Sequence, residues 1–138
     1  MIEAHAWNEQ LDLGHEAMDH DHHLQVALVG ALADAIEQGR PWLARKLTLQ
    51  LREYSGVHFG SEELLMVARG YGAAEDHAGE HRALLQAMGE VEAALDRGER
   101  ELALAFAIEV HAGLAGHIAG SDLRLAEHVR PARVTPRA

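Results

Sequence analysis

The sequence predicts an all-α protein, an up-down-up-down four-helix bundle with an N-terminal arm and a short C-terminal tail. The composition is 48% hydrophobic but only 4% aromatic, and it is rich in the helix-forming residues Ala, Leu, Glu and Arg. Few residues are β-branched and they are scattered, which argues against a sheet. A chain of 138 residues can bury one core, so we expect a single domain over 1–138.

Glycine and proline divide the chain into four segments. The predicted breaks are Gly14, Gly39-Arg40-Pro41, Gly70-Tyr71-Gly72 and Gly98. Each segment between them carries apolar residues at helical spacing, and short connections favour antiparallel neighbours. We therefore expect helices at about 16–38, 41–69, 75–97 and 99–128, with an arm over 1–13 and a tail over 129–138.

Histidine interrupts the apolar stripe of every predicted helix, and always at one end of the bundle. His22 lies near the start of the first segment and His58 near the end of the second. His77 and His81 lie near the start of the third, and His117 near the end of the fourth. These ends meet in an antiparallel bundle. Buried imidazoles need partners, and five in one apolar layer cannot satisfy one another, whereas a metal ion can.

The spacing of these residues suits metal binding. His117 and Asp122 are five residues apart, about 140° around an ideal helix, which does not suit one ion but could serve two ions side by side. Two further pairs are four residues apart and leave one helix face, namely His77 with His81 and His58 with Glu62. The candidate metal ligands are therefore His22, His58, Glu62, His77, His81, His117 and Asp122.

The ligand types leave the identity of the metal open among iron, manganese and zinc. The chain has no cysteine, which excludes thiolate-held metals and iron–sulfur clusters. Seven ligands are too many for one ion and too few for two octahedral ions, so we expect bridging carboxylates and a solvent-derived hydroxide. We interpret His20 and His23 as surface or supporting residues, and Glu63 as a solvated charge. A bundle without metal is the alternative.

These motifs resemble those of bacterial hemerythrins, from Trp7 to Asp122. The resemblance implies a non-haem di-iron centre, with a bridging hydroxide or oxide, that binds dioxygen reversibly for storage, delivery or sensing. It further implies that one iron is held by His77, His81 and His117, the other by His22 and His58 with one open position, and that Glu62 and Asp122 bridge them. The matching residues are Met18-Asp19, His22, His58-Phe59-x-x-Glu62-Glu63, Met66, Tyr71, His77-x-x-x-His81 and Leu114-x-x-His117-Ile118-x-x-x-Asp122.

The chain also departs from the family pattern near the centre. A glycine, Gly113, replaces the usual aromatic residue four positions before His117, which indicates either close packing or a widened pocket. The other departures are Asp21 for Gln, Gln25-Val26 for Leu-Phe, Gly72 for Pro and Leu84 for Phe. We expect the oxygen pocket to include Gln25, Gly113, Leu114 and Ile118.

The alternative function is a di-iron peroxidase or a nitric-oxide or redox sensor, made leaky by a widened pocket. We expect no catalytic residue, because no general acid or base stands out beyond the ligands, although Tyr54, Gln25 and Glu63 lie close enough in sequence to be candidates. The formal net charge of −10 argues against a nucleic-acid partner. We find neither a continuous apolar run of 18 residues nor a signal peptide, and therefore expect a cytoplasmic protein without membrane insertion. The sequence does not identify a protein partner.

Overall fold

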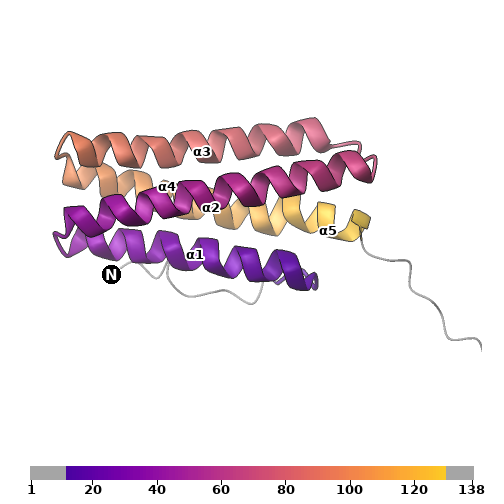
Figure 1. Ribbon diagram of the computed structural model, residues 1–138, viewed down its shortest axis with the longest axis horizontal. Helices are drawn as coiled ribbons and strands as arrows, with labels where there is room; N and C mark the ends of the chain where they lie inside the picture. Colours follow the sequence, from indigo (N-terminus) through magenta and orange to yellow (C-terminus); the bar gives the residue numbers. More distant parts are fainter. Residues whose placement is uncertain (1–11, 130–138) are drawn as a thin grey trace, which may run out of the picture.

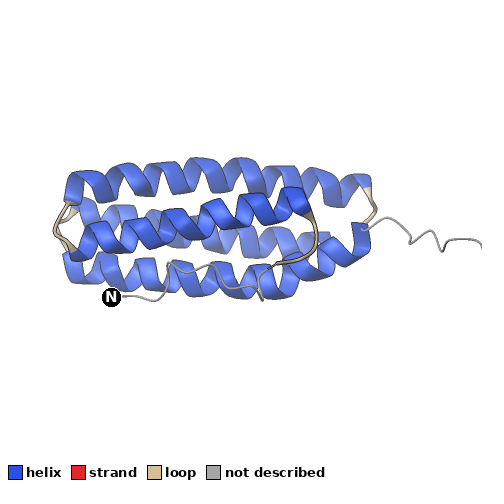
Figure 2. Cartoon of the chain, turned by 90° about the horizontal axis from the view of Figure 1, so that it is seen from below, coloured by secondary structure: helices blue, strands red, loops and turns tan. Residues whose placement is uncertain are grey.

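A computed structural model describes residues 12–129 and confirms the all-α four-helix bundle. Within this range there are helices and no strand. The predicted arm and tail lie almost entirely outside the described residues. The long helical rods lie side by side and alternate in direction (Figures 1 and 2). The elements are α1 (Glu16–Glu37), α2 (Pro41–Ala68), α3 (Ala74–Asp96), α4 (Arg100–His117), the π-helical turn η3 (Ile118–Asp122) and α5 (Leu123–Val129).

Local chemistry sets the ends of these helices. Gly39 and Gly98 follow α1 and α3 with φ of 68° and 71°, a left-handed conformation that favours glycine. Pro41 opens α2, at the position where its missing N–H leaves no hydrogen bond unmade. The His15 side chain caps α1 by accepting a hydrogen bond from the backbone N–H of Met18. The connections can therefore be short, which places consecutive helices next to each other.

The core consists of two apolar clusters with a polar layer between them. Helices α1 and α3 each contact both α2 and α4, so the bundle has a square cross-section. The larger cluster reaches from Phe59, Leu84 and Leu114 to the α1–α2 and α3–α4 connections. The smaller cluster includes Met66 and Ile118. On α3 and the fourth rod the buried histidines fall between members of the two clusters, while on α1 His22 lies between Met18 and Val26 of the smaller cluster. Apolar side chains therefore enclose the polar layer on both sides.

The fourth rod is one continuous run of α4, η3 and α5. By length and composition alone it is apolar enough to cross a membrane, with a mean hydropathy of 1.5 in its most apolar window. Core helices of bundles have the same property, because they pack an apolar face against their neighbours. Here Ala103, Ala107 and Val110 are completely buried inside the bundle.

Candidate metal centre

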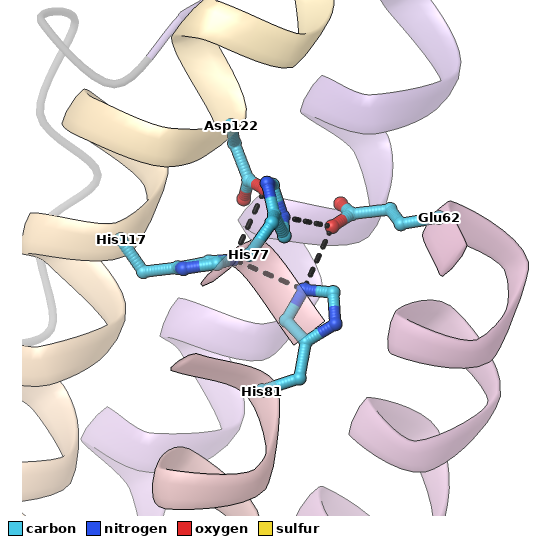
Figure 3. Close-up of side chains that lie close together, drawn as sticks. All are labelled: Glu62, His77, His81, His117 and Asp122. Carbon is cyan, nitrogen blue, oxygen red and sulfur yellow. Dashed lines mark hydrogen bonds and ion pairs between the residues drawn. The ribbon is translucent and has the colours of Figure 1, made fainter. Parts of the chain in front are cut away.

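The structure brings all seven predicted ligands into the polar layer, where each is at most 4% exposed. Five of them, which we call the three-histidine group, come from α2, α3 and the fourth rod and point toward one another (Figure 3). The distances are 3.1 Å from His77 Nε2 to Glu62 Oε1, 3.0 Å from His81 Nε2 to Glu62 Oε1, 3.0 Å from His77 Nε2 to Asp122 Oδ1, and 3.1 Å from His117 Nε2 to Asp122 Oδ1.

A second group overlaps the first and contains His22, His58, Glu62 and Asp122, which we call the two-histidine group. The Nε2 atom of His22 lies 2.9 Å from Asp122 Oδ2, and that of His58 lies 2.7 Å from Glu62 Oε2. Glu62 and Asp122 therefore each present one carboxylate oxygen to the three-histidine group and the other oxygen to the two-histidine group. This is the arrangement that a carboxylate needs in order to bridge two cations.

The donor atoms fit a bound cation better than they fit one another. His22 Nε2 and His58 Nε2 lie close to carboxylate oxygens, but neither contact forms a hydrogen bond. Both nitrogens, Glu62 Oε2 and both Asp122 oxygens are buried without a hydrogen-bond partner among the described residues. Buried polar atoms are rarely left without partners, since this costs roughly 1–3 kcal/mol each. Imidazole and carboxylate are suitable ligands for divalent iron, manganese or zinc.

The π-helical turn η3 corrects one expectation from the sequence. On an ideal α-helix, His117 and Asp122 would point in different directions and could not serve one ion. The i→i+5 repeat of η3 brings residues five apart close to the same face, and the two side chains approach within 3.1 Å. Both residues therefore belong to the three-histidine group, while Asp122 also reaches the two-histidine group.

Three carboxylates outside the ligand set contact the Nδ1 atoms of ligand imidazoles. Glu63 Oε2 lies 2.9 Å from His81 Nδ1, so the interpretation of Glu63 as a merely solvated charge was wrong. Its side chain is 44% exposed but still reaches the ring on α3. The sequence analysis missed two further contacts, Asp21 Oδ2 to His58 Nδ1 at 2.8 Å and Glu80 Oε1 to His117 Nδ1 at 2.9 Å. Such contacts fix the proton on Nδ1 and leave Nε2 free for a cation.

The sequence does contain a signal for these carboxylates, namely their position directly beside a predicted ligand. Each stands next in sequence to a ligand but bonds to an imidazole on the neighbouring helix. A step of one residue turns about 100° around a helix, from the centre of the layer toward the next helix. The pairs are Asp21 before His22, Glu63 after Glu62 and Glu80 before His81.

In the metal-free chain, the imidazoles and carboxylates shift one another's pKa values. Burial alone would lower the pKa of His22 and His77, but the adjacent carboxylates outweigh it and raise each to about 9. Burial alone would raise the pKa of Glu62 and Asp122, but the surrounding imidazoles bring both below their usual range. The metal-free centre therefore holds protons at neutral pH, and a cation that binds must displace them.

The four predicted oxygen-pocket residues differ in their surroundings. Leu114 and Ile118 are completely buried beside the polar layer. Gln25 is 1% exposed and donates Nε2 to Ser55 Oγ at 2.9 Å. A Cβ atom at Gly113 would come within 3.0 Å of Leu84 Cδ2, so the leucine occupies the space beside this glycine. The structure thus favours close packing at Gly113 over a widened pocket.

Fold and site together define a helical bundle with a buried, cation-binding layer of histidine and carboxylate. Residues 13–129 match the family described as "Hemerythrin HHE cation binding domain". The chain belongs to this hemerythrin family, as the sequence motifs predicted. No match was found among curated proteins or among solved structures.

Proposed function

We propose that the chain holds two iron ions, joined by a bridging hydroxide or oxide, and binds dioxygen reversibly. The observation that carries the proposal is the division of Glu62 and Asp122 between the two ligand groups. With one oxygen facing each group, each carboxylate can bridge a pair of ions, as the overlap of the groups requires. Membership of a cation-binding family supports the binding of metal cations by these residues.

The two groups are unequal, which gives the centre one position for a ligand. Three imidazoles and two carboxylate oxygens, together with the bridging hydroxide, would supply the six ligands of an octahedral ion. The two-histidine group has one imidazole fewer and would leave one position open. Two ferrous ions would supply the pair of electrons that reversible dioxygen binding requires. Dioxygen would therefore bind on the side of His22 and His58.

The surrounding side chains would keep this position dry. Leu114, Ile118 and Phe59 are buried around the polar layer, with at most 2% of their surface exposed. The ring of Phe59 stacks on that of His81, with centroids 4.1 Å apart and planes 9° apart, and so fixes the orientation of this imidazole. Excluding water slows the irreversible oxidation that would end reversible binding.

The first test is metal analysis together with a visible spectrum of the reduced protein before and after exposure to air. We expect two irons per chain and an absorption band that appears with oxygen and disappears under vacuum. His22→Ala should lose the band, because it removes one of two imidazoles at the open side. His20→Ala is the matched control, since His20 is exposed two residues away and should leave the band unchanged. A wild-type chain that binds iron but shows no oxygen-dependent band would refute oxygen binding.

A peroxidase or a nitric-oxide or redox sensor is the second candidate. This alternative depends on a widened pocket at Gly113, where Leu84 occupies the space. The structure therefore provides no support for it at this position. A peroxidase assay with a colorimetric reductant separates the candidates, because an oxygen-binding protein should turn over hydrogen peroxide no faster than the His22→Ala variant.

A further inference from the structure

The carboxylates that contact ligand imidazoles at Nδ1, which we call the outer carboxylates, are distributed unequally over the two ligand groups. In the three-histidine group, Glu63 and Glu80 contact two different imidazoles. The two-histidine group has one such contact, from Asp21 to His58. The Nδ1 atom of its other imidazole, His22, is buried without a hydrogen-bond partner among the described residues. Asp21 is therefore the only outer carboxylate that the described chain provides for this group.

Asp21 is itself held in place by a tyrosine. Its Oδ2 atom lies 2.8 Å from His58 Nδ1, while its Oδ1 atom accepts a hydrogen bond of 2.7 Å from the Tyr54 hydroxyl. Tyr54 and His58 are one turn apart on α2, and Asp21 reaches them from α1. With one oxygen bound to each, the carboxylate has little freedom to rotate.

We propose that Asp21 and Tyr54 are positioning residues of the two-histidine half of the proposed metal centre. Asp21 keeps the proton of His58 on Nδ1, so that Nε2, which faces Glu62, is left free for a cation, and Tyr54 keeps Asp21 in place. The charge of Asp21 also makes the imidazole a stronger ligand and favours the more highly charged state of the ion. An uncharged glutamine, the residue expected here from the hemerythrin resemblance, could not supply this charge.

A purely structural role is the competing explanation. The Asp21 side chain is 35% exposed, and its two contacts could simply tie α1 to α2. A tie of this kind would affect the unfolding temperature alone. A positioning residue must also change metal affinity on one side of the centre, and the redox potential there. The experiment therefore measures affinity and potential as well as stability.

We would titrate Zn²⁺ and, separately, Fe²⁺ into the full chain against a chromophoric chelator. The wild type should bind two ions per chain. Asp21→Asn should bind one of them with roughly 10–100-fold lower affinity, the usual effect of losing an outer partner of a ligand, and the other with unchanged affinity. Tyr54→Phe should show a smaller loss at the same ion. The matched control is Asp96→Asn, since Asp96 is ion-paired to Arg45 at the opposite end of the bundle.

Two spectroscopic measurements complete the test. In the zinc-loaded wild type, NMR should show an exchange-protected His58 Nδ1 proton, which Asp21→Asn should lose. In the iron-loaded protein, Asp21→Asn and Asp21→Gln should both raise the midpoint potential. Asp21→Glu should bind the ion more tightly than Asp21→Asn but less tightly than the wild type, because it keeps the negative charge on a longer side chain.

The outcomes separate this inference from the proposed function. Unchanged affinity and potential in Asp21→Asn would overturn the inference, even if the variant unfolded at a lower temperature. Equal weakening of both ions would also overturn it. If Asp21→Asn does not fold, Tyr54→Phe provides the test, and an unchanged affinity for both ions in that variant overturns the inference. A wild type that binds two ions but no oxygen would end the oxygen proposal and leave this inference standing.

Discussion

Buried imidazoles can bind a cation only if their protons and orientations are fixed, and neighbouring side chains supply this control. Glu63 contacts the Nδ1 atom of His81, which fixes the position of the ring proton. The ring of Phe59 stacks on that of His81, which fixes the plane of the imidazole. His117 is held through Glu80, which also accepts a hydrogen bond of 2.6 Å from Ser121. The centre therefore depends on more residues than the seven that would touch metal.

Gln25 is a buried polar residue that bears on the proposed oxygen binding. It is buried one turn after His22, and its Oε1 atom has no hydrogen-bond partner among the described residues. We expect Gln25→Leu to slow decay of the oxygen-bound form severalfold, because a side chain of similar size then presents no polar group to attract water. The measurement is the rate at which the oxygen-dependent band is lost in air.

The matched control for this prediction is Ser55→Ala. Ser55 accepts the hydrogen bond from Gln25 Nε2, so the control removes the partner but keeps the buried amide. It should not slow the decay. Equal decay rates for Gln25→Leu and the wild type would show that this side chain does not control access of water.

At the scale of the elements, the π-helical turn η3 sets the geometry of the centre. It lies between α4 and α5 in a stretch weakened by Gly116 and Gly120, where helix propensity is low. The irregularity brings Asp122 over His117 and lets this carboxylate face both ligand groups. A strictly α-helical fourth rod would keep the two residues about 140° apart.

A pair of glycine substitutions in α4 should separate helix propensity from packing. At Gly116 a Cβ atom would meet no side chain within 4 Å, so Gly116→Ala should stabilise the protein by about 0.5–1 kcal/mol. At Gly113 the same change places a Cβ atom 3.0 Å from Leu84 Cδ2, and the leucine, 7% exposed, must shift. Gly113→Ala should therefore gain less than Gly116→Ala or lose stability. Urea unfolding of both variants measures the difference.

The companion variant is Leu84→Ala, which removes the contact. If packing is the reason for glycine at position 113, then Gly113→Ala should be less harmful in the Leu84→Ala background than in the wild type. Equal effects in both backgrounds would mean that Leu84 does not restrict this position.

The sequence was sufficient to predict the four rods, because glycine and proline separate them and their apolar stripes are helical. The seven ligand positions could be proposed because histidines interrupt those stripes at one end. The π-helical turn could not be predicted, since on a regular α-helix two side chains five residues apart point in different directions. The contacts that Asp21, Glu63 and Glu80 make with imidazoles were missed because each carboxylate reaches a histidine on another helix. The choice between packing and pocket at Gly113 required the position of Leu84.

At the scale of the whole molecule, the proposed centre would cross-link the bundle. Its ligands come from α1, α2, α3 and the fourth rod, and it lies between the two apolar clusters. A cation bound only by the folded chain stabilises it by about 2.7 kcal/mol when its concentration is 100 times Kd. Removing both proposed ions with a chelator should therefore lower the unfolding temperature by about 20 °C for a domain of this size. Differential scanning calorimetry with and without chelator measures this shift.

The control for metal removal is the His22→Ala, His77→Ala double variant, which lacks one imidazole from each group. Its unfolding temperature should not respond to the chelator. A wild-type protein with the same unfolding temperature in both conditions would show that metal does not cross-link the helices.

The charges of the centre should give the metal-free and metal-loaded proteins opposite responses to pH. In the metal-free chain, the pKa values of His22 and His77 rise from 6.5 to about 9 on folding. Folding therefore favours their protonated forms, and this stabilisation is fully present below pH 6.5 and lost as pH rises through 9. The lowered pKa values of Glu62 and Asp122 contribute stability above their unfolded values of 4.5 and 3.8, which is lost on further acidification.

Metal-free protein should consequently be most stable between about pH 4.5 and 6.5 and lose stability toward pH 9. Metal-loaded protein should gain stability over the same rise, because cation binding requires neutral imidazoles and protons compete with it. Urea unfolding at pH 6, 7.5 and 9, with and without chelator, should give free energies of unfolding that change in opposite directions. If both forms changed in the same direction, the raised histidine pKa values would not control the stability of the bundle.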